Sequence, residues 1–166
     1  MKLTYVRGEK TDLQAYVDAS WADEDNNRKS TTGWCMYLGG NLISWRTIAQ
    51  RSVARSSFEA ELMALSDVAS EIIWFRKLLY DLQIEQEGAT QVHEDKQGVI
   101  DCVYSEGSYG NRTKHIDVRY FYTREQIVKG ILRVTYIATE YQRADIMTKA
   151  LQRVKFEYFR RLLGLQ

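Results

Sequence analysis

The sequence contains no proline and only two cysteines, Cys35 and Cys102, among its 166 residues. Two cysteines form at most one disulfide, so a small domain held together by several disulfides is excluded, and a reducing compartment is the default expectation. The chain also lacks an apolar run long enough to span a membrane, and its first residues do not form a signal peptide. We therefore expect a globular domain with no membrane partner.

The sequence also has almost no excess of one charge over the other, because 23 Lys and Arg residues nearly balance 22 Asp and Glu residues, for a net charge of +1. Domains that hold nucleic acid by bulk charge are usually strongly basic. A nucleic-acid partner would therefore have to contact a local basic patch or be held by a neighbouring domain. The length of 166 residues fits one domain, residues 1–166, with a sizeable core.

Periodic patterns predict alternating strands and helices along the chain. Strands are expected at 13–18, 32–38, 41–46, 90–94 and 131–137. Helices are expected at 56–81, 96–104, 115–129, 139–150 and 154–163. Three strands followed by alternating helices and strands indicate an α/β fold, in which a five-stranded mixed sheet is flanked by helices on both faces.

Local signals support several of these boundaries. Gly39-Gly40 is a hairpin signal between the second and third strands. The segments 56–59 and 139–142 match the capping box that opens many helices. The last helix is amphipathic, and we expect its inward face to carry Phe156, Phe159, Leu162 and Leu163.

Four acidic residues lie beside apolar segments far apart in the chain. They are Asp18 in YVDASWAD, Glu61 in RSSFEAELMAL, Asp95 in QVHEDKQGVI and Asp145 in QRADIMTKAL. A carboxylate placed against a core is costly unless its charge is compensated. Four carboxylates that meet at one point would repel one another unless divalent metal held them. Their order, Asp, Glu, Asp, Asp, is that of a ribonuclease H active site.

Glu59 and Glu61 lie two residues apart in the same predicted helix but differ in their surroundings. Glu59 has a role in the capping box, and its helical neighbours form a mostly polar face. Glu61 has no such role and shares its face with Leu65, Val68 and Ile72. A favourable position near the positive end of the helix dipole explains Glu59 fully but leaves the apolar surroundings of Glu61 unexplained. Glu61 is therefore the better functional candidate.

The other three acids have simple structural interpretations when each is taken alone. Asp18 could be the polar end of a strand, Asp95 an N-cap residue, and Asp145 a solvated helix position. The constellation, rather than any single residue, favours a shared site.

Other catalytic chemistries have little support. His93, His115 and the two cysteines lack the paired spacing of zinc ligands. No serine lies in a nucleophile elbow, and Gly39-Gly40 lacks the helix and lysine of a phosphate-binding loop.

Several motifs in fixed order closely resemble the ribonuclease H domain of copia-type (Pseudoviridae) retrotransposon polyproteins. They include the four acidic segments above and NRTKHIDVRYFYTREQIVKG at 111–130. The resemblance covers about Leu3 to Leu165 and implies a ribonuclease H-like fold. It also implies that residues 1–10 are a remnant of the junction to reverse transcriptase.

The resemblance assigns roles that the residues alone do not. It implies that Asp18, Glu61, Asp95 and Asp145 are catalytic and bind two Mg²⁺ ions, for which Mn²⁺ can substitute. The implied substrate is an RNA–DNA hybrid, and the implied partner is the reverse transcriptase domain of the same polyprotein. The candidate substrate contacts lie near the first three acids or in the loop before the helix expected at 115–129: Ser20, Arg55, Ser57, Lys96, Gln97, Arg112, Lys114 and His115.

Some positions depart from the family pattern. Lys96 and Gly98 replace the Asn and Ser that relatives often have, and many relatives carry proline where this chain has Gly107, Ala138 and Gln152. The segment 139–144 also lacks the histidine that helps product release in cellular ribonucleases H. A decayed or domesticated copy that binds nucleic acid or supports the polymerase without catalysis is therefore the alternative.

Two further alternatives concern the reaction class and the place of action. An integrase core typically uses two aspartates and a late glutamate, whereas here the glutamate is second, which favours ribonuclease H. The expected place of action is the cytoplasmic virus-like particle of the parent element, with the nucleus as the alternative. If the acids repel one another, Asp18→Asn should raise the melting temperature of the metal-free protein.

Overall fold

A central sheet of five strands organises the computed structural model, which describes residues 2–8, 10–22, 28–105 and 114–166, without the side chains of 114–117. The strands are β1 (Leu13–Ser20), β2 (Thr31–Leu38), β3 (Asn41–Ala49), β4 (Thr90–Glu94) and β5 (Leu132–Tyr136), in the order β3-β2-β1-β4-β5. β1, β2 and β3 pair antiparallel, whereas β4 runs parallel to both β1 and β5. The predicted mixed sheet is therefore confirmed.

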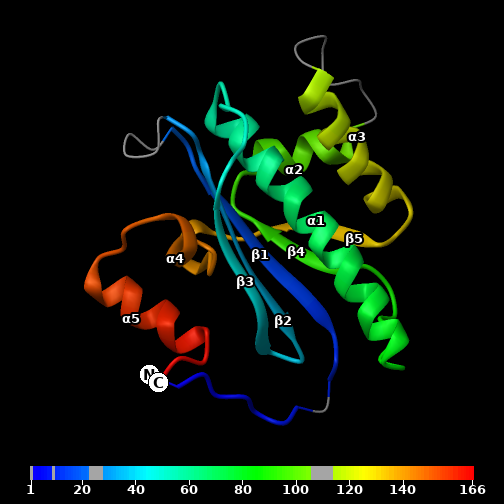
Figure 1. The fold of residues 1–166 in the computed structure, drawn as a ribbon, viewed down its shortest axis with the longest axis vertical. Coiled ribbons are helices and arrows are strands. Elements are labelled where there is room, and N and C mark those ends of the chain that lie inside the picture. The colour runs from blue at the N-terminus through cyan, green and yellow to red at the C-terminus, as the bar shows by residue number, and fades with distance from the viewer. Residues whose placement is uncertain (1, 9, 23–27, 106–113) are drawn as a thin grey trace.

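Helices cover both faces of this sheet (Figure 1). One face carries α1 (Ser57–Asp81), α2 (Gln97–Tyr104) and α3 (Lys114–Val128), and the other carries α4 (Asp145–Thr148) and α5 (Arg153–Leu162). Among the described residues, none of these helices combines the length and the apolar character needed to cross a lipid bilayer. The predicted fold class, α/β with helices on both faces, is confirmed.

β1 lies at the centre of the sheet and is buried on both of its faces. Leu13, Ala15 and Val17 belong to the core under α1, and Tyr16 belongs to the second core under α4 and α5. Asp18 continues the Tyr16 side of the strand and is fully buried. A charged residue at such a place needs compensation from its neighbours.

The long helix α1 begins after Ser56 as predicted. Among the described contacts only the Ser56 half of the predicted capping box forms, because Glu59 bonds to the Arg55 amide rather than to that of Ser56. The Ser56 hydroxyl accepts a hydrogen bond from the Glu59 amide at 3.2 Å, and the Glu59 carboxylate accepts one from the Arg55 amide at 2.7 Å. On the other side of α1, Glu61, Leu65 and Ile72 are buried as expected. The mostly polar face that Glu59 shares with Met63, Ser66 and Ser70 is not a solvated face, because Met63 and Ser66 are buried as well.

Two predictions near the C-terminal end were also wrong. The segment 139–150 is not one helix, because a 3₁₀ turn, η2 (Thr139–Tyr141), is followed by the separate α4. The Thr139 hydroxyl caps no helix and instead donates to the Asp95 carboxylate at 2.8 Å. In α5, Phe159 and Leu163 are buried, but Phe156 is 42% exposed because α5 contacts the domain over a narrower stripe than its pattern implied.

Gly33 lets α4 lie directly on the sheet. It pairs with Asp18 across β1 and β2, and a Cβ atom placed on it would lie 2.6 Å from Thr148 Cγ2 and 2.7 Å from Met147 Cβ. Distances this short require α4 to move, since packed cores have few voids into which a neighbour can shift.

We therefore predict that Gly33→Ala destabilises the protein by about 1–3 kcal/mol, the usual cost of overpacking. Thermal unfolding should show a melting temperature lower by roughly 2–10 °C, given about 2–4 °C per kcal/mol for a domain of this size. Gly98→Ala is the matched control, because its new Cβ would meet only Phe58 at an ordinary 3.9 Å. An unchanged melting temperature for Gly33→Ala would show that α4 does not rest on β2 as described.

The two ends of the chain lie side by side (Figure 1). Leu3 and Leu165 form an antiparallel bridge, and the Lys2 amide donates to the Gln166 carbonyl at 2.7 Å. The Gln166 amide donates back to the Lys2 carbonyl at 2.9 Å. The assignment of residues 1–10 to a junction stays a prediction, although residues 2–4 pack against this domain.

Candidate metal centre

Three of the four predicted acids meet at one place. Asp18 lies in β1, Glu61 in α1, and Asp95 directly after β4. One carboxylate oxygen from each lies within 4.8 Å of the other two. The topology explains this meeting, because β1 and β4 are parallel neighbours and α1 packs across β1.

Within this carboxylate triad (Asp18, Glu61 and Asp95), the negative charge of Glu61 is poorly compensated by its neighbours. Glu61 is only 6% exposed, and its Oε2 atom is buried without a hydrogen-bond partner among the described residues. Burial raises the pKa of Glu61 well above its usual value, and the nearby charges of Glu94, Asp18 and Asp95 raise it further. A buried carboxylate that is grouped with two others and keeps an oxygen unpaired among the described residues can offer a ligand atom to a cation.

The fourth acid, Asp145, is linked to Asp18 of the triad through the Lys149 side chain. Asp145 is 1% exposed, and its carboxylate accepts from Lys149 Nζ at 2.7 Å and from Lys155 Nζ at 2.5 Å. The same Lys149 Nζ lies 2.9 Å from Asp18 Oδ1. Asp18 and Asp145 therefore share one ammonium group. Burial raises the pKa of Asp18, although Lys149 and the Thr148 hydroxyl oppose this shift.

The segment before α4 is held by side chains that sequence reasoning did not single out. The Gln142 amide is fully buried and donates to the carbonyls of Val17 at 2.9 Å and His93 at 3.3 Å. The Arg143 guanidinium lies over the rings of Tyr16 and Tyr37, at 4.7 and 4.8 Å from their centroids. These contacts fix the start of α4, and with it Asp145, against β1.

Glu94 is a second residue that sequence reasoning missed. It is fully buried, its Oε1 accepts from the Lys96 amide at 3.0 Å, and its Oε2 has no partner among the described residues. Burial raises its pKa well above the usual value. The alternation of Thr90, Val92 and Glu94 as buried positions in β4 was the available signal.

The donor set suits a hard divalent cation. Asp18, Glu61 and Asp95 offer only carboxylate oxygens, which Mg²⁺ and Mn²⁺ prefer and zinc does not require. The Glu61 carboxylate, whose Oε2 has no hydrogen-bond partner among the described residues, would gain a partner on binding such an ion. The residues therefore fit the predicted cofactor class, whereas the identity and number of ions stay predictions.

The candidate substrate contacts are only partly gathered. Lys96 Nζ donates to the Ser57 hydroxyl at 2.5 Å, which links the start of α1 to the segment after Asp95. Ser20 ends β1, Arg55 is exposed before α1, and Gln97 is exposed at the start of α2. Arg112 lies outside the described residues, and Lys114 and His115 belong to α3 without described side chains.

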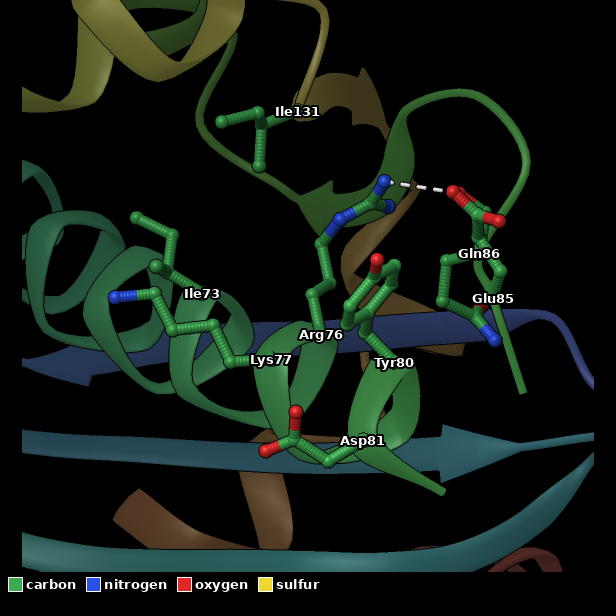
Figure 2. A pocket seen from close by; sticks show the side chains of 8 residues that line it. All are labelled: Ile73, Arg76, Lys77, Tyr80, Asp81, Glu85, Gln86 and Ile131. Atoms are coloured by element: carbon green, nitrogen blue, oxygen red, sulfur yellow. Dashed lines mark hydrogen bonds between the residues drawn. The ribbon is translucent and has the colours of Figure 1, made fainter. Parts of the chain in front are cut away.

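A cavity of about 430 Å³ lies at the other end of α1, remote from the triad (Figure 2). Arg76 points into it and donates to the carbonyls of Gln86 and Gly88 and to the Thr90 hydroxyl, each at 2.9 Å. These bonds fasten α1 to the start of β4. Because they occupy the guanidinium with backbone partners, we interpret this cavity as structural.

His93 offers a test of the packing behind the site. Its ring stacks on Tyr16 at 4.4 Å, and burial together with the Arg143 charge lowers its pKa to about 4. The folded state therefore prefers the neutral imidazole. Its stabilising effect is complete above the unfolded pKa of about 6.5 and is lost as the pH falls toward 4.

We predict that His93→Phe, which keeps the aromatic stack, loses less stability than the wild type between pH 7 and pH 4.5. Thermal unfolding of both proteins in EDTA across this range measures the difference. The gap in melting temperature should shift in favour of the variant as the pH falls. A gap that does not change with pH would mean that His93 is not held neutral.

No protein-family model matches the sequence. The chain is, however, similar to curated retrotransposon proteins over nearly its whole length. It is 38% identical over 98% of its residues to the retrovirus-related Pol polyprotein from transposon TNT 1-94 of Nicotiana tabacum. It is 36% identical over 96% of its residues to the corresponding polyprotein from transposon RE2 of Arabidopsis thaliana. The chain spans only 13% and 11% of the lengths of these two relatives.

Solved structures show the same fold. RNase H1 from Halobacterium salinarum has a TM-score of 0.57 at 16% identity, covering 82% of this chain and 94% of that one. The N-terminal RNase H domain of Rv2228c from Mycobacterium tuberculosis has a TM-score of 0.58 at 10% identity, covering 91% and 97%. LC11-RNase H1, solved in complex with an RNA/DNA hybrid, has a TM-score of 0.52 at 15% identity, covering 82% and 94%.

Proposed function

Because the chain belongs to the ribonuclease H domains of copia-type retrotransposon Pol polyproteins, we propose that it hydrolyses the RNA strand of RNA–DNA hybrids during reverse transcription. One observation supports this proposal above the others. Three carboxylate oxygens, from Asp18, Glu61 and Asp95, lie within 4.8 Å of one another, and Glu61 keeps a buried oxygen without a partner in the part of the chain that the structure describes.

The residues around the triad suggest how the work is divided. Asp18 belongs to the triad and also shares the Lys149 ammonium with Asp145, so it is the residue that would contact both of two bound Mg²⁺ or Mn²⁺ ions. Glu61 and Asp95 would hold the ion on the leaving-group side, and Asp145 would hold the ion on the water side. When bound, such ions supply an activated water and stabilise the leaving 3′ oxygen.

We expect the domain to select RNA through contacts with the sugar-phosphate backbone of the nucleic acid rather than with its bases. Proteins distinguish RNA from DNA through the 2′-hydroxyl in a wide, shallow minor groove. The linked Lys96 and Ser57 offer an ammonium and a hydroxyl beside Asp95 and Glu61 for this purpose. With a net charge of +1, the domain should bind hybrid weakly by itself, and the reverse transcriptase of the polyprotein would supply the missing affinity.

A labelled hybrid tests the proposal. With MgCl₂ at low salt, the wild-type chain should cut the RNA strand slowly and leave 5′-phosphate and 3′-hydroxyl ends. Asp95→Asn should be inactive, and RNA alone or DNA duplex should stay intact. If the wild type binds the hybrid at low salt but never cuts it, the chain is a non-catalytic nucleic-acid-binding module instead.

A further inference from the structure

Every carboxylate oxygen of Asp18 and Asp145 is already engaged by a donor. Lys149 Nζ contacts Asp18 Oδ1 at 2.9 Å and Asp145 Oδ1 at 2.7 Å. The Thr148 hydroxyl donates to Asp18 Oδ2, and Lys155 Nζ contacts Asp145 Oδ2 at 2.5 Å. All three donors come from α4, from the residue that ends it, and from α5. This half of the centre is therefore neutralised from within the protein.

The other half of the centre differs. Among the described residues, neither Glu61 nor Asp95 forms an ion pair, and Glu61 Oε2 has no hydrogen-bond partner. Of the hydrogen bonds between described residues, Asp95 Oδ2 accepts the one from the neutral Thr139 hydroxyl, at 2.8 Å. A first divalent ion at the triad would therefore meet two carboxylates, Glu61 and Asp95, that form no ion pair among the described residues. A second ion between Asp18 and Asp145 would meet an ammonium group instead.

We propose that Lys149 acts as a built-in cation that makes metal binding sequential. The first ion binds at Asp18, Glu61 and Asp95, and a second binds only when it displaces the Lys149 ammonium from between Asp18 and Asp145. This inference rests on the proposed function, because it concerns the ions that the proposed reaction uses. It assigns Lys149 as a positioning residue for the second ion rather than as a catalytic residue.

Lys149 can leave this position at modest cost. It follows the last residue of α4, and its backbone amide is fixed by the Asp145 carbonyl at 2.9 Å. Its side chain is 37% exposed, whereas those of Asp18 and Asp145 are 1% exposed. The flexible stem can therefore swing the ammonium into solvent while the carboxylates stay in place. Lys155 cannot replace it, because among the described contacts Lys155 reaches only Asp145 of the two acids.

The same arrangement protects the metal-free fold. Two buried carboxylates that share one ammonium avoid the mutual repulsion that unpaired charges would cause. The second ion therefore replaces the Lys149 ammonium when it binds. The affinity for this ion is reduced by the free energy needed to displace Lys149. The first ion makes no such exchange at Glu61 and Asp95, which form no ion pair among the described residues.

Titration of the metal-free full chain with MnCl₂, followed by calorimetry and by the electron paramagnetic resonance signal of free Mn²⁺, tests the proposal. The wild type should bind one ion, with a second at least about tenfold weaker. Lys149→Met should tighten the second ion at least about tenfold, equivalent to about 1.4 kcal/mol. Lys149→Gln, which keeps a hydrogen-bond donor but removes the charge, should do the same and serves if the Met variant is unfolded by circular dichroism.

Lys96→Met is the matched control. It removes one ammonium from the other side of the triad, where Lys96 contacts Ser57 rather than Asp18 or Asp145. Equal tightening of the second ion by the Lys96 and Lys149 variants would overturn the proposal, because bulk charge would then explain both. Two equivalent ions in the wild type would overturn it as well. Cleavage failure with sequential binding intact would refute only the proposed function, whereas absence of any Mn²⁺ binding would refute both.

Discussion

Asp18→Asn should lower the rate of hybrid cleavage by at least roughly 10²- to 10³-fold, the loss that removal of a single preorganised electrostatic contact causes in other hydrolases. Asp18 is the only one of the four predicted acids that contacts both halves of the centre, through the triad and through Lys149. Its replacement therefore weakens the ligand sets of both expected ions. Single-turnover cleavage of a labelled hybrid under saturating Mg²⁺ is the measurement.

The variant should remain folded, because asparagine keeps the size of Asp18 and an oxygen that can accept from Lys149 or Thr148. Asp81→Asn is the matched control, since it makes the same chemical change in an exposed residue at the far end of α1. It should cleave at the wild-type rate. Comparable cleavage rates for Asp18→Asn and Asp81→Asn would show that the centre around Asp18 takes no part in the reaction.

Glu61→Gln should raise the stability of the metal-free protein by about 1–3 kcal/mol, the usual cost of a buried polar group without a partner. The corresponding rise in melting temperature is roughly 3–10 °C for a domain of this size. The reason is that Glu61 is buried, lacks a partner at Oε2 among the residues with described positions, and lies near the charges of Glu94, Asp18 and Asp95. A neutral amide removes that repulsion. Lys149 and Thr148 already compensate the charge of Asp18. We therefore expect the stabilisation of the metal-free protein from Glu61→Gln rather than from Asp18→Asn.

The pH dependence of this effect has a definite sign. The pKa of Glu61 is raised in the folded state, so the wild type is most stable where this carboxyl is protonated and loses stability as the pH rises through that pKa. Glu61→Gln lacks this loss. Its advantage in EDTA should therefore be large at pH 8 and smaller at pH 5. With saturating Mg²⁺ the order should reverse, because the wild type gains a metal ligand that the variant lacks.

Glu59→Gln separates this effect from a general change in helix charge. Glu59 lies half a turn earlier in α1 and accepts from the Arg55 amide, a bond that a glutamine oxygen can keep. Its melting temperature should not rise in EDTA. Equal stabilisation by both substitutions would indicate that the helix dipole, rather than crowding of carboxylates, is responsible.

The sequence predicted the sheet and α1 well because both depend on local periodicity. Alternation gave the buried strands, and the Ser56 cap with the apolar face of Glu61 gave the helix and the choice between two glutamates. Asp18, Glu61 and Asp95 meet because of the topology of the sheet, since parallel strands bring distant segments to one edge of it. Their assignment as catalytic residues stays a prediction.

Features that depend on tertiary contacts were missed. The predicted helix at 139–150 failed because Gln142 turns its amide into the sheet to satisfy two backbone carbonyls, which no local pattern reveals. The engagement of Lys149 by two acids, one of them 131 residues away, is equally invisible to periodicity. Glu94 was overlooked because it reads as the polar end of a short strand rather than as a member of its buried face.

The pairing of the two chain ends has a mechanical consequence. Lys2 bonds to Gln166 and Thr4 bonds to Gly164 in an antiparallel arrangement, so a pulling force applied between the ends loads these bonds one after another. Such an unzipping geometry yields at low force, because only one rung resists at any moment. The five-stranded sheet behind it would then bear the load as a separate, later event. A stretched domain should therefore lengthen first by a short, reversible step.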